Sequence, residues 1–328
     1  MKLAIAGGGL IVRTAAPYFS SWGWEVDGIC VTEKGVQRAA ELAKQWGSPP
    51  VYTDYDRMLA QTAAEVVYVA VPNHMHFSFT KKALEKGFHV ILEKPITSNL
   101  KEAEELARLA KEKGRFLFEA ITTIHLPSYD LLRRNLHRIG QVKLVSCNFS
   151  QYSSRYDAFQ QGIIAPVFDP EKSGGCLMDL NIYNIHWVMN LFGAPEGVSY
   201  RANIERGVDT SGVLTMTYPD FQAVCVAAKD CGAPCRYVIQ GTKGYLLQDA
   251  PANTGGEILL HLNDGTEERL DAPVAHRMEP EFVFFREAIA SGNLDKCYAL
   301  LENSLEVANV LQAARDSAGI QFPADKMQ

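Results

Sequence analysis

The sequence predicts an α/β protein of two domains, the first built on a parallel sheet and the second on a mostly antiparallel sheet. Three observations lead to this fold class. At 328 residues the chain suits two domains of about 150 residues each. Its first part alternates short apolar runs with amphipathic helical patterns. Its later part holds short strand-like runs between turn residues. We expect a first domain over residues 1–123 and a second over residues 124–328.

The first domain is predicted to contain strand and helix in alternation. Apolar runs predict strands at residues 2–6, 26–31, 66–71, 89–92 and 116–119. Amphipathic patterns predict helices at residues 35–46, 76–86 and 100–113. Asn99 is expected to cap the last of these helices, and Gly114 is expected to end it. Parallel strands joined by helices follow from this order.

The second domain is predicted to be a sheet joined by tight turns. Strand-like runs cover residues 142–152, 198–203, 212–218, 223–228, 237–240 and 258–262. Turn sequences such as Tyr218-Pro219-Asp220 separate them, as in antiparallel sheets. Helical patterns are predicted at residues 128–137, 173–192, 280–290 and 298–317.

Composition excludes several classes of protein. Hydrophobic residues make up 47% of the chain and charged residues 21%, as in ordinary globular proteins. The formal net charge of −6 disfavours nonspecific binding of nucleic acid. No apolar run approaches the roughly 20 residues that span a bilayer, and the start lacks the pattern of a signal peptide. We therefore expect a cytoplasmic protein that uses neither membrane nor nucleic acid.

The seven cysteines are scattered and include no Cys-x-x-Cys pair, which favours simple thiols over metal ligands or disulfides. His74 and His76 are two residues apart with no nearby carboxylate or thiol. This spacing is not convincing for a metal. We expect no metal site.

A glycine turn suggests a dinucleotide site. The first strand runs into Gly7-Gly8-Gly9-Leu10-Ile11-Val12, where Gly7 and Gly9 fit the first two positions of Gly-x-Gly-x-x-Gly. The first permits a tight turn, and the second lets the backbone approach a pyrophosphate at the start of the next helix, near Leu10 and Ile11. Val12 replaces the third glycine, which implies a slightly displaced helix. A glycine pair can also serve an ordinary strand-to-helix turn.

Glu33 and Lys34 follow the second strand, about 20 residues beyond the glycines, where an acid is expected to bind the adenosine ribose. The carboxylate of Glu33 would repel a 2′-phosphate and so favours NAD over NADP, whereas Lys34 could attract that phosphate. Both residues could equally be solvated charges at the start of a helix.

Glu93-Lys94-Pro95 ends an apolar strand, at the edge where open α/β sheets bind their ligands. With the glycine turn, the run from Val69 to His76 and the run Gly174-Gly175-Cys176-Leu177-Met178-Asp179-Leu180-Asn181-Ile182-Tyr183, it makes the chain resemble the glucose-fructose oxidoreductase and inositol dehydrogenase (Gfo/Idh/MocA) family. The likeness covers nearly the whole length.

The resemblance implies a Rossmann domain with a doubly wound parallel sheet, then an α+β domain with an open, mostly antiparallel sheet. It implies an NAD(P)-dependent dehydrogenase that acts on a hydroxyl-bearing carbon of a sugar, cyclitol or related diol. The free face of the open sheet often mediates dimerisation in this family. We therefore expect a homodimer or homotetramer, with these apolar residues on the covered face: Val213, Leu214, Met216, Val224 and Val226.

The resemblance also implies roles for individual residues. It places Lys94 near nicotinamide and substrate, with a Lys94–Pro95 bond that is often cis. It identifies Asn73 and His76 with the residues that line the nicotinamide end, and Glu119 with the acid that ends the last strand of the first domain. Pro72, Glu93 and Glu119 are also expected among the cofactor-binding residues. It identifies Asp179 and Tyr183 with the family's aspartate and its following histidine or tyrosine. Their i, i+4 spacing puts both side chains on one helical face. Asn181 replaces the usual glycine between them, which leaves the local packing open.

These assignments suggest a proton-transfer group for carbinol oxidation. A phenol with an ordinary pKa near about 10 is a poor base at neutral pH, but an ammonium favours the phenolate. We assign Tyr183 as general acid/base, Lys94 as its electrostatic partner and Asp179 as the group that orients substrate or lysine. Each could instead be structural: a core tyrosine, a surface lysine and a helix cap.

Two further residues are candidates for substrate binding. His186 falls on the same helical side as Tyr183, although it could equally pack beneath the sheet. Arg155 lies in a loop, where specificity residues often occur, although a solvated surface turn is as plausible. Two other functions remain open for the fold: a non-catalytic nucleotide-sensing regulator, and a glycosidase that uses tightly held NAD.

Overall fold

The computed structural model describes residues 1–326 and divides into two compact units. Unit 1 combines Met1–Ala120 with Glu281–Leu305, and unit 2 combines Ile121–Pro280 with the stretch that begins at Glu306. Residues 281–305, which we had assigned to the second domain, thus make their contacts within unit 1.

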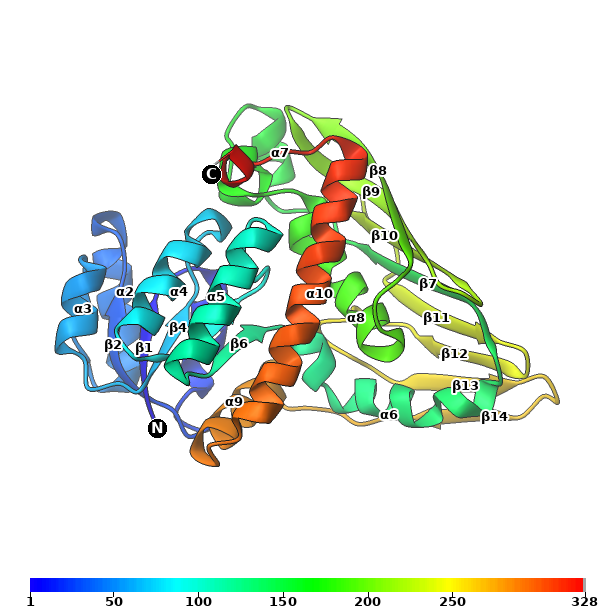
Figure 1. Cartoon of the computed structure of the whole chain (residues 1–328), viewed down its shortest axis with the longest axis horizontal. Coiled ribbons are helices and arrows are strands. Elements are labelled where there is room, and N and C mark those ends of the chain that lie inside the picture. The colour runs from blue at the N-terminus through cyan, green and yellow to red at the C-terminus, as the bar shows by residue number, and fades with distance from the viewer. Residues whose placement is uncertain (327–328) are drawn as a thin grey trace. The chain divides into compact units, whose positions relative to one another are not determined.

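Unit 1 is built on a six-stranded parallel sheet (Figure 1). Its strands are β1 (Lys2–Ala6), β2 (Glu25–Cys30), β3 (Val51–Tyr52), β4 (Val66–Val69), β5 (His89–Glu93) and β6 (Leu117–Ala120). They lie in the order β3-β2-β1-β4-β5-β6, and each neighbouring pair is parallel. This is the doubly wound order of dinucleotide-binding sheets, so the expected fold class of the first part is confirmed.

Short and medium helices connect these strands. They are α1 (Leu10–Ala15), α2 (Val36–Ala43), α3 (Tyr55–Gln61), α4 (His76–Glu85) and α5 (Leu100–Lys113), with 3₁₀ turns at Ala16–Tyr18, Glu33–Gly35, Lys44–Trp46 and Asn73–Met75. The Asn99 side chain accepts a hydrogen bond from the Glu102 N–H at 2.9 Å. Gly114 adopts a left-handed conformation with φ 59° at the other end of α5. Both predicted caps of α5 are confirmed.

Two late helices follow, α9 (Glu279–Ala290) and α10 (Leu294–Ala318). Phe282 of α9 is fully buried and accepts a hydrogen bond from the indole N–H of Trp24 at 3.2 Å. Its ring lies 5.2 Å from that of Tyr68 on β4. Aromatic packing therefore holds α9 against the parallel sheet of unit 1.

Unit 2 is built on an eight-stranded sheet. Its strands are β7 (Val142–Ser150), β8 (Gly197–Glu205), β9 (Val208–Thr217), β10 (Gln222–Ala228), β11 (Arg236–Gly241), β12 (Gly244–Gln248), β13 (Ile258–Leu262) and β14 (Glu267–Leu270). The order is β14-β13-β12-β11-β7-β10-β9-β8. Only the β7–β10 pair is parallel among the described strand pairs of this sheet. The expected open, mostly antiparallel sheet is confirmed.

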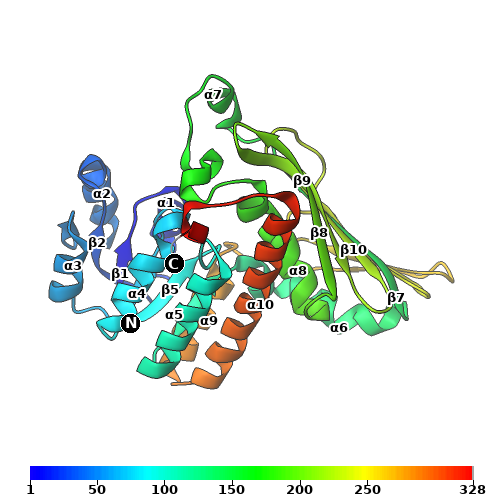
Figure 2. The same ribbon diagram turned by 45° about the horizontal axis from the view of Figure 1, so that its top comes forward.

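Unit 2 also contains α-helices. They are α6 (Pro127–Asn135), α7 (Tyr156–Gln160), α8 (Ile182–Phe192) and the C-terminal part of α10, with 3₁₀ turns at Thr122–His125, Leu136–Ile139, Pro166–Phe168, Pro170–Lys172 and Pro323–Lys326. A π-helical turn, Leu177–Asn181, leads into α8. Figures 1 and 2 show α6, α8 and α10 on the same side of the sheet, and no described helix on the other side.

The register of β9 corrects one expectation about the free face. Leu214 and Met216 are fully buried against the helices, whereas Val213 is 40% exposed on the opposite face. Because side chains alternate along a strand, these three residues cannot share a face, and our grouping of them was wrong. Val224 and Val226 of β10 are half-buried, and Val226 pairs with Val213. The free face thus keeps Val213, Val224 and Val226.

No helix among residues 1–326 is both long and apolar enough to cross a membrane.

Candidate active site

The carboxyl edge of the unit 1 sheet collects the residues predicted to bind a cofactor. Gly7 follows β1, Pro72 follows β4 after two residues, and Glu93 ends β5. The strand order reverses between the neighbours β1 and β4, and ligands of open α/β sheets bind at such a point. The parallel topology therefore places these segments at one edge.

Gly7 occupies a position that only glycine fits. Its φ is +117°, and a Cβ atom there would lie 2.2 Å from the carbonyl oxygen of Ala70. The Gly7 N–H donates to the Cys30 oxygen at 2.8 Å. Strands β1 and β4 can approach this closely only without a side chain between them.

Gly9 has no such steric reason to be glycine. It is the N-cap of α1, and a Cβ atom on it would meet nothing within 4 Å. The space beside Gly9 is open, which fits a phosphate that approaches the backbone. Leu10 is 59% exposed at the same turn, whereas Val12 is fully buried. The turn therefore fits a dinucleotide pyrophosphate.

Glu33 and Lys34 form the 3₁₀ turn that follows β2, and both side chains are exposed. Strand β2 pairs with β1, so this turn emerges one strand away from the glycine turn. The carboxylate of Glu33 is exposed and therefore accessible to a ribose hydroxyl.

Two buried polar side chains hold the segment that follows Lys94. The Lys94–Pro95 bond is cis. His76 is 1% exposed, and its ring nitrogens lie 2.7 Å from the Pro95 oxygen and 2.9 Å from the Val71 oxygen. Glu119, 6% exposed, accepts the Ile96 N–H at 2.9 Å. His76 and Glu119 thus connect the segment after β5 to the segments that follow β4 and end β6.

Glu93 and Lys94 are half-buried. The carboxylate of Glu93 accepts a hydrogen bond from the Tyr68 hydroxyl. Since Tyr68 lies on the neighbouring strand β4, this bond fixes the backbone that presents Lys94.

The motif Asp179 to Tyr183 spans the junction of the π-helical turn and α8. The Asp179 side chain is 28% exposed, and Tyr183 is 7% exposed with its ring 5.6 Å from that of Phe149. Asn181, which replaces the family's glycine, is fully buried and donates to the Cys225 oxygen at 3.3 Å. The substitution ties the π-helical turn to β10. Such turns are frequent at functional sites.

A buried carboxylate anchors the start of the same turn. Asp209 is 1% exposed and accepts hydrogen bonds from the Leu177 N–H at 2.6 Å and from the Tyr200 hydroxyl at 2.8 Å. Burial raises the pKa of Asp209 to about 6, and this effect outweighs the two hydrogen bonds, which lower the pKa. Gly175 lies directly beside this carboxylate, with φ +126° and no room for a Cβ atom.

Lys229 is a residue that our sequence reasoning missed. It follows β10, is 2% exposed and forms an ion pair with Asp179. We had expected Asp179 to orient substrate or Lys94. No local sequence pattern could pair Lys229 with Asp179, which lies 50 positions earlier. The available signal was that Lys229 directly follows an apolar strand.

The two further substrate candidates differ in exposure. His186 is fully buried within α8, and Arg155 is exposed. The buried His186 side chain therefore has no surface for a substrate to contact in this conformation. Arg155 lies in a loop where the neighbouring hydroxyl of Tyr152 donates to Asp157.

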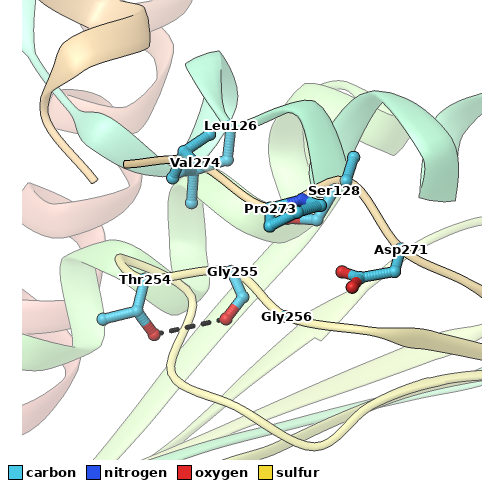
Figure 3. Close-up of a pocket in the computed structure, with 9 residues that line it drawn as sticks. Leu126, Ser128, Thr254, Gly255, Gly256, Asp271, Pro273 and Val274 are labelled. Carbon is cyan, nitrogen blue, oxygen red and sulfur yellow. Dashed lines mark hydrogen bonds between the residues drawn. The ribbon is translucent and has the colours of Figure 1, made fainter. Parts of the chain in front are cut away.

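A separate pocket of about 210 Å³ lies elsewhere in unit 2 (Figure 3). It is lined by Leu126, Ser128, Thr254, Gly255, Gly256, Asp271, Ala272, Pro273 and Val274. The Thr254 hydroxyl bonds to the Gly255 oxygen beside it. None of the predicted site residues lines this pocket. Within residues 1–326, no three His, Cys, Asp or Glu side chains are grouped to hold a metal.

The pKa of His76 leads to a prediction about acid stability. Burial lowers this pKa to about 4, while the two carbonyl contacts raise it. Below about pH 6.5 His76 is protonated in the unfolded chain but stays neutral in the folded protein. Its contribution to the free energy of unfolding is therefore lost as the pH falls toward 4. Between pH 7 and pH 5 this loss should be about 2 kcal/mol.

Urea unfolding of the wild type and of His76→Gln at both pH values measures this loss. Asp209 acts in the opposite direction because its pKa is raised, so the difference between the two proteins isolates His76. The same pH dependence in both would contradict the prediction.

Comparisons with known proteins agree with this geometry. A family model described as the oxidoreductase family with an NAD-binding Rossmann fold matches residues 1–121, and one for the GFO/IDH/MocA C-terminal domain matches residues 135–247. The chain is 34% identical over 305 residues to the scyllo-inositol 2-dehydrogenase (NADP(+)) of Bacillus subtilis, with 90% of each protein covered. It is 27% identical over 343 residues to the trans-1,2-dihydrobenzene-1,2-diol dehydrogenase of Mus musculus, with 99% of each covered.

The fold is also that of a solved structure. A 3-ketoreductase from Actinomadura kijaniata, in complex with TDP-benzene and NADP, matches with a TM-score of 0.83 and 24% identity. The match covers 97% of this chain and 98% of that one.

Proposed function

Because the chain belongs to the GFO/IDH/MocA family of NAD-binding oxidoreductases, we propose that it transfers a hydride between a nicotinamide and a hydroxyl-bearing carbon of a sugar, cyclitol or related diol. The names of its relatives support this substrate class, since they include an inositol and a dihydrodiol dehydrogenase. The observation that carries the proposal is the Gly7 turn, which admits no side chain, in a chain that also has Lys94, Asp179 and Tyr183 at the family's motif positions.

The bound nicotinamide supplies the hydride acceptor or donor. In oxidation, the carbinol C–H bond breaks and its electron pair leaves with the hydride. The hydroxyl proton goes to the phenolate oxygen of Tyr183, and the carbon–oxygen bond becomes a carbonyl. Lys94 favours the phenolate electrostatically and donates a hydrogen bond to the substrate oxygen. Asp179 orients the substrate by accepting a hydrogen bond from a second hydroxyl. Reduction reverses these steps.

We assign the cofactor's pyrophosphate to Gly7, Gly9, Leu10 and Ile11, and its adenosine ribose to Glu33 and Lys34. The nicotinamide end is assigned to Pro72, Asn73, Glu93 and Lys94. His76 and Glu119 hold the carbonyl oxygen and the N–H of the Pro95–Ile96 peptide, directly after Lys94–Pro95, which supports an indirect role for them: they position the segment that carries Lys94.

We retain Arg155 as a candidate for substrate binding because its exposed side chain could reach a polyol. His186 becomes the weaker candidate, since contact with a substrate would require α8 to move.

A panel of aldoses, cyclitols and diols with each cofactor, followed by nicotinamide absorbance, tests the function. Neutral polyols should react best. The charged groups that act on the buried Cys176, three residues before Asp179, are Lys229, Asp209, Asp179 and Asp230, an excess of negative charge that disfavours sugar acids and sugar phosphates. Turnover only with anionic substrates, or with no hydroxylated compound, would contradict the proposal.

We predict tighter binding of NADH than of NADPH, because the exposed carboxylate of Glu33 repels a 2′-phosphate. Fluorescence titration of both reduced cofactors measures the ratio of their dissociation constants. Glu33→Ala should shift this ratio toward NADPH, whereas Glu41→Ala, which alters an exposed carboxylate paired with Lys44, should leave it unchanged. Tighter NADPH binding by the wild type would reverse the assignment.

We predict a homodimer or homotetramer that covers the free face of the unit 2 sheet. This face presents Leu144 on β7, which is 51% exposed, and the cross-strand pair Val213 and Val226 on β9 and β10, and exposed apolar surface of this kind favours association. Light scattering at micromolar concentration should give the mass of two or four chains. Val226→Lys should reduce it to one chain, and Gln37→Lys, an exposed position on α2 of unit 1, should not. A monomeric wild type would contradict this prediction.

We also propose that the protein works in the cytoplasm. All seven cysteines are free thiols, which suits a reducing compartment.

A further inference from the structure

Lys229 is held at a fixed place in unit 2. Its side chain is 2% exposed, and its ammonium forms an ion pair with the carboxylate of Asp179. The ammonium also donates to the Val167 oxygen at 3.3 Å and lies 4.7 Å from the centre of the Phe168 ring. A long flexible side chain therefore has three contacts that define where its charge lies.

Stability alone gives little reason for this arrangement. Removing an ammonium from water costs several kcal/mol, and a buried ion pair often contributes no more than apolar residues of the same size. Methionine would fill the space without that cost. The partner of the buried charge is more informative, because Asp179 is the carboxylate that the proposed function assigns to the substrate.

The neighbouring carboxylates have other donors. Asp209 on β9 accepts the Leu177 N–H and the Tyr200 hydroxyl, and Asp230 accepts the hydroxyls of Thr210 and Ser211 at 2.7 and 2.8 Å. The other titratable group beside them is the buried thiol of Cys176. Asp179 is thus the carboxylate to which Lys229 is directly joined, while the others add negative charge around the pair.

We propose that Lys229 is a positioning residue for Asp179: its ammonium keeps the carboxylate ionised and turned toward the place where a substrate hydroxyl donates to it. Lys229 itself touches neither substrate nor cofactor. The role of Asp179 toward the substrate rests on the proposed function, whereas the ion pair between Lys229 and Asp179 does not.

The first test needs no turnover. With ¹³C-labelled aspartate, the carboxylate signal of Asp179 is identified by its loss in Asp179→Asn, and its titration is followed in the wild type and in Lys229→Met. Removing a cation in direct contact should raise the midpoint of the Asp179 titration by at least about one pH unit. An unchanged midpoint would overturn the proposal, whatever reaction the protein catalyses.

The second test uses the best substrate of the polyol panel. Lys229→Met should lower kcat by about 10- to 100-fold, the scale expected for a misplaced group, without changing the dissociation constant of NADH. A new loss of activity at acidic pH should appear, because Asp179 now becomes protonated there. In the double variant Lys229→Met/Asp179→Asn this acid limb should be absent, and kcat should fall no further than in Asp179→Asn.

Arg315→Met is the matched control. Arg315 is 1% exposed and paired with Asp325 in unit 2, so the variant removes another buried cation without touching Asp179. It should lower stability without adding an acid limb. The same loss of kcat at every pH in Lys229→Met would mean that Lys229 is merely structural.

Lys229→Arg keeps the test decisive if the methionine variant fails to fold. A guanidinium retains the charge but cannot reproduce a point contact with one oxygen, so we expect the wild-type pH profile with a kcat reduced several-fold. A new acid limb in Lys229→Arg, in spite of its retained positive charge, would overturn the proposal. Failure of the proposed function is recognised separately, as absence of turnover by the wild type alongside a shifted Asp179 titration in the variants.

Discussion

Replacing Tyr183 by phenylalanine should lower kcat by about 10²- to 10⁴-fold, as expected when a positioned acid/base is lost. The dissociation constant of the cofactor should hardly change, because Tyr183 is not among the proposed cofactor contacts and phenylalanine keeps its ring. Steady-state kinetics on the best polyol, together with a fluorescence titration of NADH, measure the two quantities.

The pH profile gives an independent check on Tyr183. In the oxidative direction the wild-type rate should rise with pH, because the substrate hydroxyl must lose its proton to a base, and this limb should vanish in Tyr183→Phe. Tyr218→Phe is the matched control, since Tyr218 is also buried in unit 2 and its hydroxyl donates to the Gly193 oxygen at 2.8 Å. That variant should lose a little stability and keep the limb. Near-normal turnover in Tyr183→Phe would move the acid/base role to another residue.

Replacing Lys94 by alanine should reduce kcat at least as much as Tyr183→Phe. The variant removes both the charge that favours the phenolate and a hydrogen-bond donor to the substrate oxygen. Lys94→Arg should recover only part of the rate, because a planar guanidinium cannot take the place of an ammonium that donates to one oxygen. Single-turnover rates at saturating cofactor separate the chemical step from binding.

Lys82→Ala serves as the control for Lys94. Lys82 is an exposed lysine of the same unit, paired with Asp56 on the surface, and its loss should leave kcat unchanged. Full activity of Lys94→Arg would show that only the positive charge is needed. Full activity of Lys94→Ala would remove Lys94 from the mechanism.

Local sequence signals predicted much of unit 1. The glycine turn, the cap at Asn99 and the apolar runs are features of neighbouring residues, and the structure contains each of them. Strands β3, β12 and β14 escaped prediction for different reasons. β3 is two residues long, and β12 holds three consecutive apolar residues without an alternating pattern. β14 is the charged edge sequence Glu267–Leu270, which suits an edge strand but lacks an apolar pattern.

The candidate site was predictable where a motif carries it and not where the fold creates it. Lys94, Asp179 and Tyr183 stand in recognisable runs of sequence. The ion pair of Asp179 with Lys229 joins a helical turn to a strand end, and the contacts of His76 join two strand ends. Such pairs depend on the sheet order. The wrong face for Leu214 and Met216 came from grouping apolar residues without applying the two-residue period of a strand.

Isotope transfer tests the central claim, direct hydride transfer, most directly. The best polyol is prepared with deuterium on the carbinol carbon that is oxidised, and the reduced cofactor is analysed by mass spectrometry after turnover. We expect deuterium in the reduced nicotinamide and a slower chemical step with the deuterated substrate. Cofactor that binds but never gains deuterium would indicate a nucleotide sensor, and transient labelling without net reduction would indicate a glycosidase; either result would contradict a dehydrogenase.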